Sequence, residues 1–439
     1  MRNSFSRKCR TSIVLIFITV SISLIFSSCS PKPKPYSPPE RTDWAPDGPR
    51  PVPYIGDASD PAGGDVLGNP VGYFRTLHGD SLNSDEVAIA AAPVFEQDWV
   101  SEPHTYNATG PTFDKFGNVY FSPRFSPQED VLLISLDPND GSRRWAIPGG
   151  PRGSGAPLIL DDPDNPGEQI IYVGSYDGAV AVKPDADTNL DKVVETGEMV
   201  WDVSTGLTAT PGEYPPTVFG LNYDPTTDTL IGLTADNHMY VLDRKSGSLL
   251  LSSPYSLPDI APSPAKSINI PDFIKPRVDQ IAAPLLGDTS VEYLIEIILG
   301  NNFMVANYFS VDPHTGKIWV AATAPDGEDG AVDGVSEYGA LYCLKLVSAG
   351  GGLYTVDNLF HISFEGGTAS TPALSADGQR VYVGDNFGKL IAIDASDGSI
   401  LWELDVGEQI FGSISVASDN GELYCVTTSA IIKVTDHGT

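Results

Sequence analysis

The feature that most constrains the fold of this 439-residue chain is an internal repeat. A glycine stands four residues before a tryptophan at three places, and at a fourth place leucine replaces the tryptophan. The pairs are Gly141 with Trp145, Gly197 with Trp201, Gly398 with Trp402, and Gly247 with Leu251. Repetition over this distance is typical of architectures that stack one supersecondary unit several times.

The clearest unit covers residues 369–404 and predicts four short strands. Val381–Gly384 alternates as a strand does, and Asn386–Gly388 supplies the positive φ of a tight hairpin. A second apolar run follows at Leu390–Asp394, and an Asp-Gly turn at Asp397 leads into an outer strand that contains Trp402. Four consecutive antiparallel strands make one blade of a β-propeller, so the chain is predicted to be all-β.

The same pattern predicts six blades. They lie near 106–148, 152–206, 212–255, 301–364, 368–407 and 410–435. The last supplies only three strands, and Val94–Trp99 can supply the fourth, which would pair the two chain ends and remove the free edges. Seven or eight blades stay open as alternatives, because the gap from Leu251 to Phe360 is about two repeats long; residues 260–300 could instead form a helical insertion.

Residues 381–402, VYVGDNFGKLIAIDASDGSILW, resemble the quinoprotein-type (PQQ-like) propeller repeat, and the resemblance extends over roughly 71–439. The segment 73–80 is similar to the first segment of that family. The family includes quinone-dependent alcohol dehydrogenases and also non-enzymatic propeller lipoproteins, such as the propeller subunit of the outer-membrane β-barrel assembly machinery. The resemblance implies that large apolar side chains dock each blade on its neighbour. The positions are Trp99, Trp145, Trp201, Leu251 and Trp402.

The N-terminus predicts export and lipidation. Residues 1–10 are basic and residues 11–26 are apolar but short for a membrane span, which indicates a signal peptide over 1–28. Phe26-Ser27-Ser28-Cys29 resembles the bacterial lipobox, with Phe26 where leucine is usual, so Cys29 is predicted to carry the lipid. Ser30 after the cysteine favours the outer membrane, facing the periplasm or the cell surface. Residues 29–70 form a proline-rich tether and an irregular lead-in.

Charge and cysteine content narrow the partners. Loss of the four basic residues of the signal peptide would take the formal net charge from −31 to −35. A surface this acidic repels phosphate backbones, so nucleic acid is excluded as a partner. Cys343 and Cys425 lie inside apolar strand-like runs, and we predict buried free thiols there rather than a disulfide.

Few residues in the sequence suggest catalytic or metal chemistry. The six histidines have no metal-ligand spacing and are predicted to lie at the surface or in turns. One acidic run has oxygen side chains at alternate positions, as a calcium loop does, but lacks the glycine and the final glutamate of that loop. Its residues are Asp185, Asp187, Asn189 and Asp191. Calcium is therefore a weak candidate, and no other cofactor is expected.

Three functions compete on the sequence. The preferred one is a non-catalytic envelope lipoprotein whose propeller acts as a protein-binding scaffold or assembly module for envelope protein partners. The first alternative is a PQQ-dependent dehydrogenase, although the chain has no adjacent pair of cysteines such as many of those enzymes carry. The second alternative is a propeller that senses a small molecule or a glycan.

Overall fold

The structure is a computed structural model, and it describes most of 98–438 together with three residues of 71–97. We include the segment 71–97 in the lead-in from here on. The described residues are His78, Asn83, Asp85, 98–102, 105, 109–114, 118–123, 131–148, 155–165, 168–174, 178–186, 196–204, 218–234, 237–258, 305, 307–324, 338–375, 377–417, 421–427 and 429–438. The predicted signal peptide over 1–28, the lipid site at Cys29 and the tether over 29–70 lie outside them.

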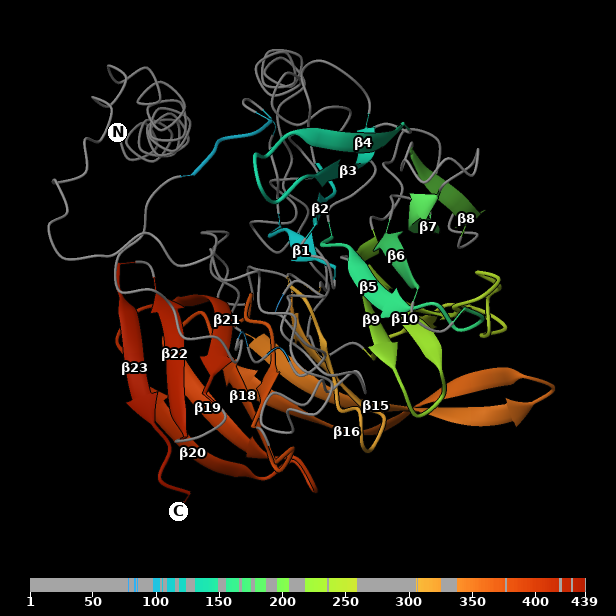
Figure 1. The fold of residues 1–439 in the computed structure, drawn as a ribbon. Coiled ribbons are helices and arrows are strands. Elements are labelled where there is room, and N and C mark those ends of the chain that lie inside the picture. The colour runs from blue at the N-terminus through green and yellow to red at the C-terminus, as the bar shows by residue number, and fades with distance from the viewer. Residues whose placement is uncertain are drawn as a thin grey trace, which may run out of the picture. The chain divides into compact units, whose positions relative to one another are not determined.

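Within these residues the chain forms six antiparallel sheets, which we number 1 to 6 in chain order (Figure 1). Sheet 1 contains β1 (Thr112–Phe113), β2 (Val119–Phe121), β3 (Val131–Leu136) and β4 (Arg143–Pro148). Sheet 2 contains β5 (Leu158–Asp161), β6 (Gln169–Gly174), β7 (Gly178–Ala186) and β8 (Thr196–Ser204). Sheet 3 contains β9 (Val218–Asp224), β10 (Thr229–Thr234), β11 (His238–Asp243) and β12 (Tyr255–Ser256).

The second half of the chain continues the pattern. Sheet 4 contains β13 (Ser310–Val311), β14 (Lys317–Thr323), β15 (Tyr338–Gly350) and β16 (Leu353–Glu365). Sheet 5 contains β17 (Ala373–Leu374), β18 (Arg380–Gly384), β19 (Lys389–Asp394) and β20 (Ile400–Asp405). Sheet 6 has three described strands, β21 (Ile410–Val416), β22 (Glu422–Thr427) and β23 (Ile431–Thr435). In every sheet each strand pairs with the next along the chain, so the first and last strands form the two edges.

The middle strands are apolar on both faces, and other sheets cover both sides of β6 and β10. Every residue of β3, β6 and β10 is buried. A strand with one solvated face would instead alternate between buried and exposed residues, as the outer strand β16 largely does. The sequence of these strands therefore encodes a stack of sheets rather than a single sheet in water.

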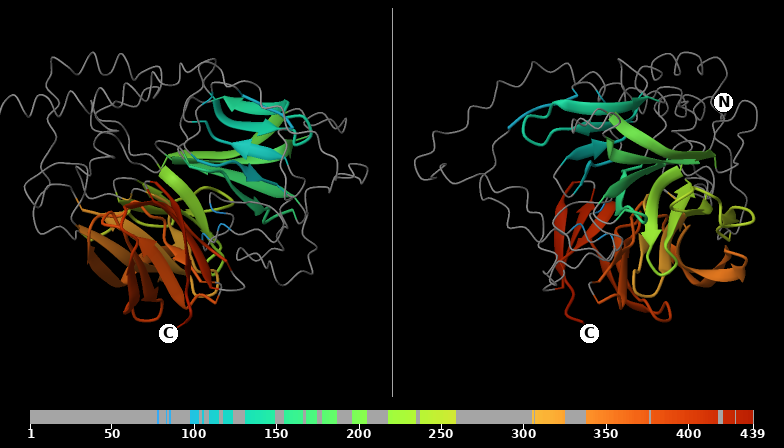
Figure 2. Two further views of the ribbon diagram at one scale, coloured as in Figure 1. Left: turned by 90° about the vertical axis from the view of Figure 1, so that its left-hand side faces the viewer. Right: turned by 45° about the vertical axis from the view of Figure 1, so that its right-hand side comes forward.

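Each pair of consecutive sheets shares one cluster of buried apolar side chains. Separate clusters join sheets 1 and 2, 2 and 3, 3 and 4, 4 and 5, and 5 and 6. Figure 2 shows sheets 5 and 6, coloured orange to red, side by side in both views. Because the clusters lie between the sheets, the free energy of apolar burial depends on how accurately one sheet is placed on the next.

A recurring Asp-x-x-x-Gly turn leads into the outer strand. In sheet 3 the N–H of Gly247 donates to the carbonyl of Asp243 at 2.7 Å, and the Asp243 carboxylate accepts from the N–H groups of Lys245 and Ser246. Gly247 has φ of +70°, a conformation that glycine adopts without steric cost. The same Asp-to-Gly hydrogen bond closes the corresponding turns of sheets 1 and 5.

The predicted fold class is confirmed: the described chain is all-β, without a helix, and its six sheets correspond to the six predicted blades. No helix in this part of the chain is long and apolar enough to span a membrane. The segment 260–300, where an extra blade or a helical insertion is an alternative, lies outside the described residues, as does the closing strand before Asp98. Cys343 and Cys425 are buried free thiols, as predicted.

Candidate functional site

At three blade positions a tryptophan ring covers the glycine that precedes the outer strand or lies near its start; two of the rings, Trp145 and Trp201, come from the preceding sheet, and Trp99 comes from the segment before sheet 1. A Cβ atom added to Gly141 would lie 2.5 Å from the ring of Trp99, and one added to Gly247 would lie 2.8 Å from the ring of Trp201. At Gly197 the nearest ring atom belongs to Trp145, at 3.0 Å. The glycine and the tryptophan of the repeat thus take part in the same kind of contact, each with a neighbouring sheet.

The indole nitrogens add directional bonds at two of these junctions. Nε1 of Trp99 donates to the carbonyl of Pro138 at 3.0 Å, and Nε1 of Trp201 donates to the carbonyl of Arg244 at 3.1 Å. Each acceptor directly follows the aspartate of the Asp-x-x-x-Gly turn. Trp402 is partly buried and packs against the cluster shared by sheets 5 and 6.

The junction between sheets 3 and 4 uses a different contact, because Leu251 occupies the tryptophan position. Leu251 is buried, and it forms a parallel bridge with Tyr354 at the start of β16. The N–H of Tyr354 donates to the carbonyl of Leu250 at 2.8 Å. At the next junction Phe360 provides the ring, and its Cδ2 would lie 2.7 Å from a Cβ added to Gly398.

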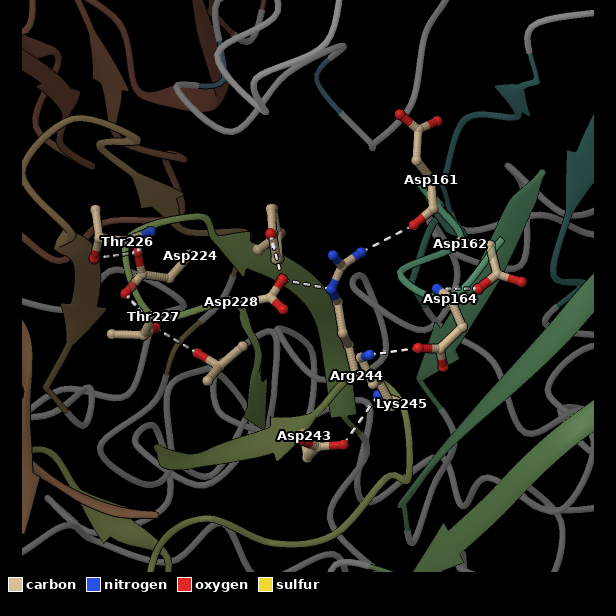
Figure 3. A network of polar contacts seen from close by, with 12 residues as sticks. Asp161, Asp162, Asp164, Asp224, Thr226, Thr227, Asp228, Asp243, Arg244 and Lys245 are labelled. Carbon is tan, nitrogen blue, oxygen red and sulfur yellow. Dashed lines mark hydrogen bonds and ion pairs between the residues drawn. The ribbon is translucent and has the colours of Figure 1, made fainter. Parts of the chain in front are cut away.

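An arginine connects sheets 2 and 3 within an acidic surface (Figure 3). Nη1 of Arg244 donates to the backbone carbonyl of Asp161 at 2.9 Å, and its Nε forms an ion pair with Asp228 at 2.5 Å. Tyr223 donates to the same Asp228 carboxylate at 2.7 Å, and the guanidinium lies 5.3 Å from the centre of its ring. Beside this group Lys245 pairs with Asp164 at 2.5 Å. The positive charges lie among the aspartates and reduce their mutual repulsion.

A second polar group links the lead-in to the last sheet. Nδ1 of His78 lies 2.9 Å from Oδ1 of Asp85, and Nε2 of His78 lies 2.9 Å from Oγ of Ser413 on β21. Ser415, two residues further along β21, donates from its Oγ to the other oxygen of Asp85 at 3.1 Å. Two residues of the lead-in are thereby bonded to two hydroxyls on one face of the first strand of sheet 6.

Two further contacts bring the same lead-in to sheets 4 and 5. Nδ2 of Asn83 donates to the carbonyl of Pro372 at 3.0 Å, just before β17. The ring centre of His78 lies 5.9 Å from that of Tyr308, two residues before β13. Tyr308 in turn donates to the carbonyl of Leu221 on β9.

The chemistry of this group follows from the inventory of donors and acceptors. An ionised Asp85 can only accept, so Nδ1 of His78 carries a proton and a neutral ring accepts from Ser413 at Nε2. This hydroxyl–imidazole–carboxylate connectivity also occurs in serine hydrolases. Here the carboxylate is held by the hydroxyl of Ser415 as well, and the side chain of His78 is 10% exposed. We interpret the group as a structural fastening.

Most of the calcium candidate lies outside the described residues. Asp185 lies on β7, and Asp187, Asn189 and Asp191 lie outside the described residues. No group of three or more His, Cys, Asp or Glu side chains suited to a metal ion occurs in the part of the chain that the structure describes.

Comparison with known proteins bears on the second half of the chain. Residues 310–437, which begin with β13 and include all of sheets 4 to 6, match the family model of outer membrane protein assembly factor BamB. The chain folds as a β-propeller, and its second half is similar to this PQQ-like family. Sheets 1 to 6 are accordingly its blades. No curated protein matches this propeller.

Solved structures that match the propeller are distant. A quinohemoprotein alcohol dehydrogenase from Pseudomonas putida has 17% identity and a TM-score of 0.40, and the match covers 73% of this chain but 55% of the enzyme. The propeller thus spans about half the length of that enzyme. BamB from Moraxella catarrhalis has 11% identity and a TM-score of 0.34, with 74% of this chain and 82% of BamB covered. The propeller domain of Myceliophteria thermophila Cps50 has 12% identity and a TM-score of 0.41, with 73% and 80% covered.

The repeat spacing marked the tryptophan positions in the sequence, whereas no pattern marked the group around His78. This histidine lies in a turn, in agreement with the prediction for histidines, but it is only 8% exposed. Its partner Ser413 is 335 positions away along the chain, and serine in a strand has no pattern that marks such a contact. The resemblance of segment 73–80 to the first segment of the family was the one signal that pointed to this region.

Proposed function

We propose that the protein is an exported lipoprotein, anchored through Cys29 to the outer membrane, whose propeller is a scaffold that binds envelope proteins. The observation that carries the proposal is the match of blades 4 to 6 to the assembly-factor family. The predicted signal peptide and lipid site agree with an envelope location. Function on a propeller depends on surfaces and loops grafted on the fold, so the binding surface must be sought on this chain itself.

Blade 4 offers such a surface in the hairpin β15–β16, which we call the arm. Both its strands have 13 residues, whereas β14 has seven, and Figure 1 shows the hairpin extending beyond the sheets. Val347, Leu353 and Leu359 on the arm are exposed apolar side chains. Exposed apolar residues on a long edge strand are suited to recognition by another chain, either through side chains or through strand addition.

The direct test is site-specific photocrosslinking in intact cells. A photoreactive amino acid replaces Leu353 on the arm, and the control replaces Leu401 on β20, which has the same residue type and the same exposure of 41%. We expect one discrete crosslinked envelope protein from position 353 and none from position 401. Identical adducts from both positions, or none from either, would refute the arm as the partner surface.

The lipid anchor is tested independently of the partner. Cys29→Ala removes the thiol that is predicted to carry the lipid, so the variant should remain unprocessed or leave the outer-membrane fraction. A variant that is processed and fractionates as the wild type does would refute lipidation at Cys29.

Turnover would favour the dehydrogenase alternative over the scaffold. The purified propeller is incubated with pyrroloquinoline quinone and calcium, and the reduction of an electron-accepting dye is followed with a panel of alcohols and sugars. We expect no rate above that of free quinone. A saturable rate that requires the protein would overturn the proposal.

A further inference from the structure

The lead-in residues His78, Asn83 and Asp85, which we call the strap, contact three consecutive blades. His78 and Asp85 bond to Ser413 and Ser415 on β21 of blade 6. Asn83 bonds to blade 5 just before β17, and His78 lies against an aromatic ring of blade 4. A segment that belongs to no sheet thus connects blades 4, 5 and 6.

The contacts lie at one level of the propeller. In blades 4, 5 and 6 a backbone hydrogen bond closes the first turn, with the donors Asp312, Ser375 and Ala417. Four residues before each of these donors stand Tyr308, Thr371 and Ser413. Two of these three residues touch the strap, and Asn83 bonds to the carbonyl of Pro372 beside the third. In blades 4 and 5 the strap therefore contacts residues just before the first strand, and in blade 6 it contacts the middle of β21, which starts three residues before Ser413.

Two of the three strap residues are buried against these blades, since His78 is 8% exposed and Asn83 is fully buried.

The backbone of the strap is also held in an unusual conformation. Asn83 has φ of +59° and Asp85 has φ of +57°, in the left-handed region that residues other than glycine seldom adopt. Such conformations persist where the surrounding contacts determine them. The side-chain bonds of Asn83 to Pro372 and of Asp85 to His78 and Ser415 supply those contacts.

We propose that the strap fastens blade 6 to blades 4 and 5. The inference goes beyond the scaffold function and does not depend on it. Neighbouring blades are also joined by the apolar clusters between them. The strap additionally connects blade 4 with blade 6, which are not neighbours along the chain. It would thus resist the separation of the last blade from the stack.

Hydrogen exchange measured by mass spectrometry tests the fastening. In His78→Ala, both ring bonds are lost, and we expect amide exchange in residues 410–416 and 371–374 to become roughly tenfold faster, while exchange in 218–243 of blade 3 stays unchanged. The matched control is His314→Ala, which removes an exposed histidine from a turn of blade 4. Ser413→Ala removes a single bond and keeps the ring, so it should give a smaller rise in the same segments.

Two results would overturn the fastening. Unchanged exchange in 410–416 and 371–374 in the His78→Ala variant would show that the strap holds nothing. A uniform rise over all blades would show loss of global stability rather than release of blade 6.

The contact between Asn83 and blade 5 is tested by thiol labelling. Thr371 is fully buried beside the carbonyl that Asn83 binds, so a Thr371→Cys variant should not react with a maleimide in the folded protein. Combining it with Asn83→Ala should increase the labelling rate at least tenfold, while buried Cys343 and Cys425 serve as internal controls. Rapid labelling of Thr371→Cys with Asn83 intact would refute the contact as a fastening of blade 5.

Discussion

The contact between a turn glycine and the ring of the preceding blade can be tested at Gly247. Its φ is +70°, and an added Cβ would lie 2.8 Å from Cδ2 and Cε3 of Trp201 and 2.8 Å from Val203. The indole cannot simply move aside, because it is buried and its Nε1 donates to the carbonyl of Arg244. The substitution Gly247→Ala therefore imposes both backbone strain and overpacking.

The two costs can be separated with a second glycine. Gly351, in the turn of the arm, has φ of +64°, and nothing lies within 4 Å of an added Cβ. Placing alanine in the left-handed region costs about 1–2 kcal/mol at either site. Overpacking against the ring adds about 1–3 kcal/mol at Gly247 alone. We expect Gly247→Ala to lose about 2–5 kcal/mol of unfolding free energy and Gly351→Ala about 1–2 kcal/mol.

The assay is urea unfolding followed by tryptophan fluorescence, with both variants measured beside the wild type. In a Trp201→Ala/Val203→Ala background both close neighbours of the added Cβ are truncated, so Gly247→Ala should then cost no more than Gly351→Ala. Equal losses for the two glycine variants in the wild-type background would refute the idea that the ring makes glycine necessary at this turn.

Three further predictions concern side chains away from that contact. Burial raises the pKa of Asp436, but a backbone N–H, the hydroxyl of Tyr382 and the charge of Arg380 together lower it below its usual value. The stabilisation that Asp436 provides is therefore present above about pH 4 and is lost as the pH falls through the lowered pKa. Asp436→Asn should destabilise the protein at pH 7 and have a smaller effect as the pH falls below about 4; a cost that does not change with pH would contradict this. Burial raises the pKa of Cys343 to about 12, so this thiol should react with a disulfide reagent at pH 8 only after unfolding, and fast reaction in the native state would show that the strand opens. Because we interpret Ser413 as structural, a fluorophosphonate probe should not label it, and labelling that depends on His78 would instead show a hydrolase site.

Much of the fold was predictable from local patterns. Gly398 and Trp402 stand at a fixed spacing because the turn and the outer strand have the same geometry in each blade. The apolar runs of β3 and β6 show that both faces of the strand are covered. These features depend on residues within one repeat, and local propensity and periodicity record them directly.

The junction at Leu251 includes a contact that no sequence pattern predicts. The repeat spacing shows that leucine stands at the tryptophan position, but it does not show that a backbone bridge to Tyr354, more than 100 positions later, forms at this junction. Backbone pairing uses groups that every residue carries, so no residue type announces it. The arm that provides the bridge lies within the predicted blade near 301–364, but the sequence did not predict the length of its two strands.

The sequence by itself determined that this chain repeats a short antiparallel unit of four strands, because turn glycines, alternating apolar residues and outer-strand rings act within about 40 residues of each other. Only the tertiary structure decided that His78 lies between Asp85 and Ser413 and that the strap reaches three blades. The physical reason is that hydrogen bonds between distant side chains depend on where the whole stack of sheets brings them, and polar residues of this kind look the same in sequence whether they are solvated or bonded.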